Sequence, residues 1–125
     1  MFIIKIKVKT KLINLTENTT DLINTNGIKK FNNISYVDKD IKYNLFIEDN
    51  KITLQRENKE FAHQMIFVEN KTYPSEYYLK ESKYSIELNV MTTKINISNN
   101  LIDITYKILE SENIYNYVLE VSDEI

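Results

Sequence analysis

The sequence predicts an all-β fold, a single antiparallel barrel of about eight to ten strands. Turn-forming residues recur about every ten residues, which is typical of short strands joined by hairpins. The segments between the turns alternate apolar and polar side chains and are rich in β-branched and aromatic residues. A two-sheet sandwich is the alternative. A closed barrel suits this composition better, because closure removes exposed edge strands.

Candidate turns divide the chain from end to end. Clusters of Asn, Asp, Ser, Gly, Glu and Lys mark them, at Asn26-Gly27, Asn32-Asn33, 38–40, 48–50, 57–59, Asn70-Lys71, 81–83, 98–100 and 111–113. Gly27 is the only glycine. We therefore expect asparagine to supply the turn positions that need a positive φ angle.

Alternation assigns an inner face to each strand. The first strand carries Ile4, Ile6, Val8 and Leu12 on one face and lysines at 5, 7, 9 and 11 on the other, which we interpret as a solvated outer face. The same period gives inner faces to residues 84–90, 102–108 and 115–121. Residues 58–69 and 111–121 also show helical spacing, but their Ile, Val, Tyr and Phe content favours strands.

Composition narrows the class of protein. A chain of 125 residues with 42% apolar and 27% charged residues is expected to form one folded domain over residues 1–125. Its net charge of −2 argues against nucleic acid as a partner. With no cysteine and one histidine, the chain offers no thiolate or multi-histidine metal site, and we expect no metal or cofactor.

The start of the chain shows no export signal. Lysines from position 5 onward interrupt the apolar N-terminus, and no apolar run is long enough to cross a bilayer. The expected location is the cytoplasm, without membrane contact.

From Asn24 onward, the order and spacing of several short motifs resemble the YwiB-like family, small bacterial proteins of unknown function. The motifs are Asn26-Gly27, Ile52-Thr53-Leu54-Gln55-Arg56, Met65-Ile66-Phe67, residues 86–92 (IELNVMT) and residues 102–106 (IDITY). The chain departs from the family pattern at two turns, where Asn58 and Ser82-Lys83-Tyr84 stand in place of glycine-containing turns. The resemblance implies a calycin-like (lipocalin-like) β-barrel, and it implies no particular activity.

Arg56 is the strongest candidate for a ligand-binding residue. It is the only arginine, and its parity with Ile52 and Leu54 places it on the inner face. A guanidinium there is costly unless it is paired. Three arrangements stay open: a carboxylate ligand held by the guanidinium fork, a carboxylate of the protein, or a stem packed inside with the charge at the rim. A cavity beside Arg56 would favour the ligand.

Tyrosines and the one histidine are the other candidates. Tyr77, Tyr106, Tyr115 and Tyr117 fall on apolar faces, where they fill a core or line a pocket for a small ligand. His63 also lies on an apolar face, as expected for a hydrogen-bonded core or rim residue. We assign no catalytic residue, and the residues assigned to a ligand site are Arg56, His63, Tyr77 and Tyr106.

Two functions follow from this interpretation. In the first, the barrel binds a small hydrophobic or amphipathic ligand, with Arg56 or a tyrosine hydroxyl fixing its polar end. In the second, the core is solid and the surface binds another protein, including a second copy as a homodimer. An enzyme would need Arg56, His63 and a carboxylate to converge, and we expect no enzymatic activity.

Overall fold

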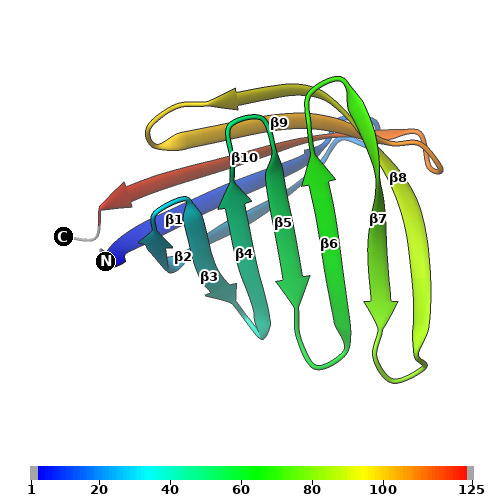
Figure 1. The fold of residues 1–125 in the computed structure, drawn as a ribbon, viewed down its shortest axis with the longest axis horizontal. Coiled ribbons are helices and arrows are strands. Elements are labelled where there is room, and N and C mark those ends of the chain that lie inside the picture. Colours follow the sequence, from blue (N-terminus) through cyan, green and yellow to red (C-terminus); the bar gives the residue numbers. More distant parts are fainter. Residues whose placement is uncertain (1–2, 124–125) are drawn as a thin grey trace.

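The computed structural model describes residues 3–123 and shows a closed antiparallel β-barrel (Figure 1). Ten strands follow one another around the barrel in chain order, and β1 closes it by pairing with both β2 and β10. The all-β barrel predicted from the sequence is confirmed. The predicted domain also includes residues 1–2 and 124–125, which lie outside the described residues.

The strands have the following bounds: β1 Ile3–Asn14, β2 Thr19–Lys30, β3 Asn33–Asp38, β4 Ile41–Ile47, β5 Ile52–Glu57, β6 Phe61–Phe67, β7 Lys71–Leu79, β8 Tyr84–Ile97, β9 Leu101–Ile108 and β10 Asn113–Asp123. The two segments that also showed helical spacing are therefore strands, β6 and β10. Across residues 3–123 there is no helix long and apolar enough to span a membrane.

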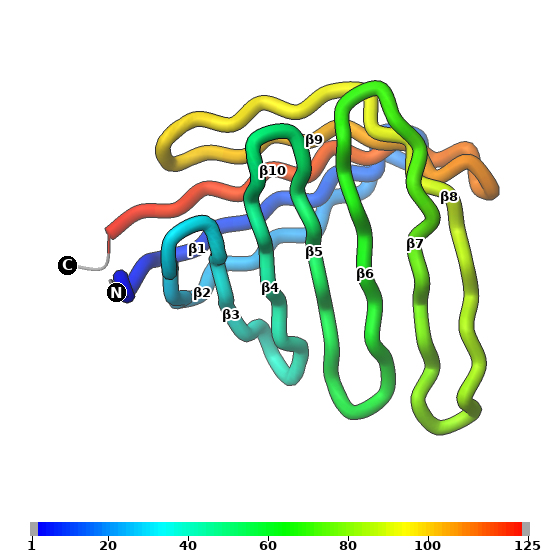
Figure 2. The backbone as a smooth tube through the Cα atoms, in the orientation of Figure 1, coloured from blue at the N-terminus to red at the C-terminus, as the bar shows by residue number. Residues whose placement is uncertain are grey.

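The barrel is flattened into two layers whose strands cross steeply. Strands β3–β7 form the front layer, and β9, β10, β1 and β2 run across behind it (Figures 1 and 2). The long strand β8 belongs to both layers: residues 84–92 pair with β7, and residues 90–97 pair with β9. A register shift between Thr92 and Lys94 lies where β8 bends from one layer into the other.

The predicted alternation is confirmed in the core. In β1, Ile6 and Val8 are buried while the lysines point outward. The buried apolar side chains come from almost every strand and include Ile34, Leu45, Ile52, Phe67, Val90, Ile104 and Leu119. Because most of the strands bury one face, a shift of one residue would expose these side chains to water, so the core fixes the register.

The turn predictions hold with one exception. Asn26-Gly27 lies inside β2, and the first hairpin instead turns at residues 15–18. The other predicted turns fall at or beside a turn. Among residues 3–123, asparagine supplies a positive φ angle only at Asn18 and Asn70; the other such positions in this range are Phe31, Lys39, Lys83 and Glu112. The expectation about asparagine is therefore wrong at these four positions, because the hairpin geometry set by the flanking strands overrides local preference.

Gly27 serves packing and not a turn. Its φ angle is not positive, and it pairs with Ile6 on one side and Tyr36 on the other, both of them buried. A Cβ atom at this position would lie 2.7 Å from the Ser35 backbone oxygen and 2.9 Å from Val8 Cγ2. Three strands therefore approach closely at a point where no side chain fits.

We predict that Gly27→Ala destabilises the barrel by about 1–3 kcal/mol, the usual cost of overpacking. The Ser35 oxygen belongs to the backbone of β3, so it cannot move without disturbing the sheet. Urea unfolding measures the effect. Asn26→Ala, at the exposed neighbouring position, is the control and should leave stability within about 0.5 kcal/mol of the wild type. Equal stability of both variants would contradict this interpretation of Gly27.

Candidate functional site

The barrel interior is hollow at one end. A cavity of about 440 Å³ is lined by Tyr36, Tyr43, Tyr106, Tyr115 and Tyr117 among other residues, and we call it the tyrosine chamber. A cavity of about 340 Å³ lies against the inner face of β6–β8, lined by Met65, Tyr77, Ile86, Leu88 and Val90, and we call it the apolar chamber. Both chambers share the side chains of Arg56 and His63.

Arg56 and His63 are joined by the register of the sheet. Arg56 of β5 lies opposite His63 of β6, and His63 lies opposite Tyr77 of β7. The three side chains therefore share the inner face, as predicted for Arg56 by its parity with Ile52 and Leu54. Three of the four predicted ligand-site residues thus lie together at the apolar chamber, and the fourth, Tyr106, lines the tyrosine chamber.

A directed chain of hydrogen bonds starts at the guanidinium. Arg56 Nε and Nη2 lie 3.2 and 3.0 Å from His63 Nδ1. Arginine can only donate, so Nδ1 accepts and the neutral ring carries its proton on Nε2. His63 Nε2 then donates to Ser75 Oγ at 2.8 Å, and Ser75 Oγ donates to the Gln64 carbonyl oxygen at 3.0 Å. Each polar group thus fixes the direction of the next.

The environment keeps His63 neutral. Burial and the adjacent positive charge of Arg56 both lower the pKa of His63, from 6.5 to about 4. The ring therefore accepts from Arg56 at neutral pH. Since its Nε2 already carries a proton, it cannot remove the proton of Ser75, so the Ser75–His63 pair lacks the arrangement of a nucleophile and its base.

Aromatic rings pack against the guanidinium of Arg56 and its histidine partner. Arg56 Cζ lies 5.4 Å from the centre of the Phe61 ring, within the range of a cation–π contact. Phe61 stacks on Tyr77 with ring centres 5.0 Å apart, and Tyr77 also contacts the His63 ring at 5.2 Å. One face of the Arg56 guanidinium therefore packs against an aromatic ring that is itself held by Tyr77.

No carboxylate neutralises this cation within the described part of the chain. The ion pair found there joins Lys80 to Glu57 at 2.6 Å, outside the chambers. Asp21 and Asp38 line the tyrosine chamber together with Lys39, but neither forms a salt bridge with Arg56. Of the three arrangements considered for Arg56, the described residues provide no internal carboxylate partner. A cavity lies beside the charge, and the side chain is partly exposed, so a position at the rim stays open.

The tyrosine chamber holds neutral hydroxyl groups. Burial raises the pKa of Tyr36, Tyr43, Tyr106 and Tyr117, while the charge of Arg56 acts in the opposite direction on the first three. The hydroxyls of Tyr36 and Tyr117 lie 3.1 Å apart, and the ring of Tyr36 stacks on Tyr43 at 4.7 Å. Tyr106 stacks on Tyr115 at 5.2 Å.

Sequence reasoning missed Tyr36, Tyr43 and Ser75. The two tyrosines share the parity of Ile34 and Leu45, both buried, so the period-two pattern could have found them. Ser75 carries no such signal. Its role depends on a cross-strand contact with His63 that only the sheet register defines.

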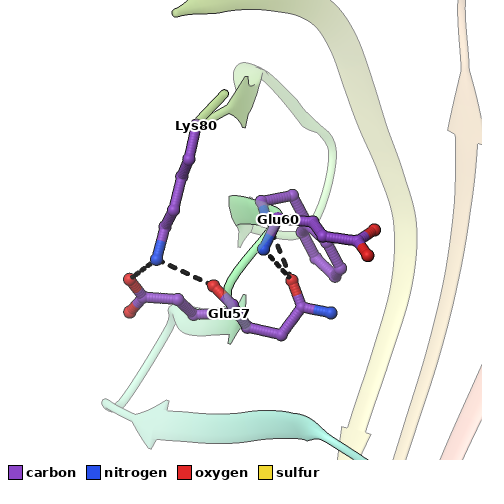
Figure 3. Close-up of polar contacts among 5 residues, drawn as sticks. Glu57, Glu60 and Lys80 are labelled. Atoms are coloured by element: carbon purple, nitrogen blue, oxygen red, sulfur yellow. Dashed lines mark hydrogen bonds and ion pairs between the residues drawn. The ribbon is translucent and has the colours of Figure 1, made fainter. Parts of the chain in front are cut away.

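The turn after β5 holds together the ends of the strands that carry the site (Figure 3). Asn58 Oδ1 accepts from the backbone N–H groups of Glu60 and Phe61, at 2.8 and 3.0 Å. Lys80 Nζ donates to the Asn58 carbonyl oxygen at 2.8 Å and to Glu57. These contacts join the ends of β5, β6 and β7, the strands that carry Arg56, His63 and Tyr77.

The fold defines the class as a closed ten-stranded antiparallel β-barrel with an internal cavity. Among solved structures, the YwiB protein from Bacillus subtilis has a similar fold, with a TM-score of 0.75 over 98% of this chain and 92% of that chain. The two sequences are 18% identical, so the likeness concerns the fold alone. It confirms the YwiB-like fold that the sequence predicts. No family model matches this chain, and no curated protein sequence matches it.

We predict that acid destabilises the barrel through His63. The pKa of His63 is about 4 in the folded chain and near 6.5 in the unfolded chain, so the unfolded state binds the proton first as pH falls. The stabilisation from neutral His63 is complete above about pH 6.5 and is lost progressively between about pH 6.5 and 4. Urea unfolding measured from neutral pH to pH 4 follows this loss.

His63→Gln is the matched control for the acid effect. Its amide oxygen can accept from Arg56, its amide nitrogen can donate to Ser75, and it does not titrate. Its stability should therefore fall less steeply over the same pH range. An equally steep fall in both proteins would assign the acid sensitivity to carboxylates elsewhere.

Proposed function

We propose that the protein binds a small amphipathic molecule whose anionic group, a carboxylate or phosphate, meets Arg56. The observation that supports this most directly is a guanidinium that faces an internal cavity and forms no salt bridge with the described residues. In this proposal the protein acts as a binding protein and not as an enzyme. A solid core would leave no such space, so the alternative of a purely structural barrel is not favoured.

The guanidinium of Arg56 has more hydrogen-bond donors than His63 engages. His63 engages Nε and one N–H of Nη2, and the guanidinium also interacts with the Tyr43 hydroxyl; the N–H groups that these contacts do not use remain on the planar fork. A carboxylate or phosphate can accept two parallel hydrogen bonds from such a fork. Because His63 is neutral, it orients the cation without cancelling its charge. An incoming anion would therefore meet a partly buried positive charge that forms no salt bridge with the described residues.

The chambers suit the rest of such a ligand. The wall of the apolar chamber beside Arg56 is hydrophobic and is formed by Met65, Ile86, Leu88 and Val90. The tyrosine chamber adds aromatic faces and hydroxyl groups that can donate to a polar atom. Both volumes fall in or near the range of small-molecule sites, roughly 300–1,000 Å³.

We predict that the protein binds decanoate at least about tenfold more tightly than decanol, and that Arg56→Met removes this preference. Methionine keeps much of the apolar stem and deletes the charge, so the fold and the chambers should persist. Isothermal titration calorimetry with each probe measures the two affinities.

Lys9→Met is the matched control for Arg56→Met. It deletes an exposed lysine of β1 that lines neither chamber. The preference for decanoate should survive in this variant. Equal binding of the acid and the alcohol by the wild type, or an unchanged preference in Arg56→Met, would overturn the proposal.

A further inference from the structure

The first half of β8 has a free edge. Residues 84–92 pair with β7 on one side, while pairing with β9 begins only at Val90. At Asn89 the free side is capped, because the Leu109 N–H donates to its carbonyl oxygen and its own N–H donates to Glu110 Oε1. Backbone groups alternate between the two sides of a strand, so those of Ser85 and Glu87 face the same way as those of Asn89. No described residue bonds them there.

Apolar side chains accompany this edge. Tyr84 is 60% exposed and Ile86 39% exposed, although both share the inner face with Leu88 and the buried Val90. The β7–β8 hairpin extends beyond the rear strands (Figures 1 and 2), and the exposure of Tyr84 and Ile86 shows that this part of its inner face is uncovered. Ile86 and Leu88 are also walls of the apolar chamber. The uncovered stripe is therefore continuous with the cavity.

We infer that a second copy of this chain pairs with the free edge of β8, strand β8 against strand β8, around a two-fold axis at Ile86. In this register Ser85 lies opposite Glu87 of the partner subunit, so the outward-facing backbone groups of both strands bond each other. Tyr84 lies opposite Leu88 of the partner subunit, and Ile86 lies opposite its own copy. Residues that face each other share a side of the sheet, so both apolar stripes lie on the inner face.

Charge and length select this register. An axis at Glu87 would set two carboxylates opposite each other, which is unfavourable. An axis at Ser85 would pair only residues 84–86, because β8 begins at Tyr84 and Lys83 is a turn residue with a φ angle of 55°. The axis at Ile86 pairs all five residues from Tyr84 to Leu88. It also ends where Leu109 and Glu110 already occupy the edge.

Pairing of two copies covers the apolar stripe and extends the sheet. The Tyr84 and Ile86 side chains of each copy gain apolar neighbours and lose water contact, which is the driving force for association. The same side chains lengthen the wall of the apolar chamber at its open side. The arrangement does not depend on a bound ligand, so it stands apart from the proposed function.

Ile86→Lys tests the interface without ligand. Sedimentation of the wild type at up to about 100 µM should show a dimer, and Ile86→Lys should be monomeric with an unchanged circular dichroism spectrum. Leu22→Lys is the control. It places the same charge at a side chain that is 73% exposed on β2, a strand that pairs with β1 and β3 and not with β8, and the dimer should survive. A monomeric wild type, or a dimer that persists in Ile86→Lys, would overturn the inference.

A single cysteine tests the register. The chain has no cysteine, so any disulfide-linked dimer must join the introduced residue to its own copy. Facing residues of a non-hydrogen-bonded pair have Cα atoms about 4.5 Å apart, within reach of a disulfide. Ile86→Cys should therefore crosslink under a mild oxidant, and Tyr84→Cys should not, because its copy would be more than about 10 Å away. Crosslinking of Tyr84→Cys with none in Ile86→Cys would contradict the proposed axis.

Discussion

One interaction organises the open end of this barrel: the partly buried guanidinium of Arg56 is hydrogen-bonded to a neutral acceptor and not to an anion. Removing a charge from water costs several kcal/mol unless its hydrogen bonds are replaced. His63 replaces two of them through Nδ1, and the Phe61 ring covers one face of the cation. Neither group carries a negative charge. Arg56 therefore keeps its electrostatic attraction for an anion while its position is fixed. The same side chain lines both chambers.

The sheet makes this arrangement possible. Arg56, His63 and Tyr77 lie on three consecutive strands and face one another because β5, β6 and β7 are joined in a continuous antiparallel register. The turn at Asn58 and the bond from Lys80 hold the ends of these strands together. Strand β8 then bends between the two layers, and its first half stays outside the closed part of the barrel. The bend leaves the first half of β8 with a free edge, and residues of that half line the apolar chamber.

Period-two alternation was sufficient to predict the strands, their inner faces and the inward position of Arg56, because burial of one face dictates the pattern. It was not sufficient for contacts that depend on register. The bond between His63 and Ser75 joins residues on neighbouring strands, and nothing in either segment alone encodes it. Asn26-Gly27 was misinterpreted as a turn because glycine serves both turns and close packing, and only the neighbouring strands decide between them. Likewise, hairpin geometry places Phe31 and Glu112 at positive φ angles against their own preference.

The tautomer of His63 is decisive for this arrangement, because it reports whether Arg56 donates to a neutral ring. The chain has one histidine, so its imidazole nitrogens give unambiguous signals in ¹⁵N NMR of the labelled protein. We predict an unprotonated Nδ1 and a protonated Nε2 at neutral pH, a state that persists as pH is lowered below 6.5. A charged imidazolium at neutral pH, or a ring protonated on Nδ1, would contradict the account, since neither could accept a hydrogen bond from Arg56.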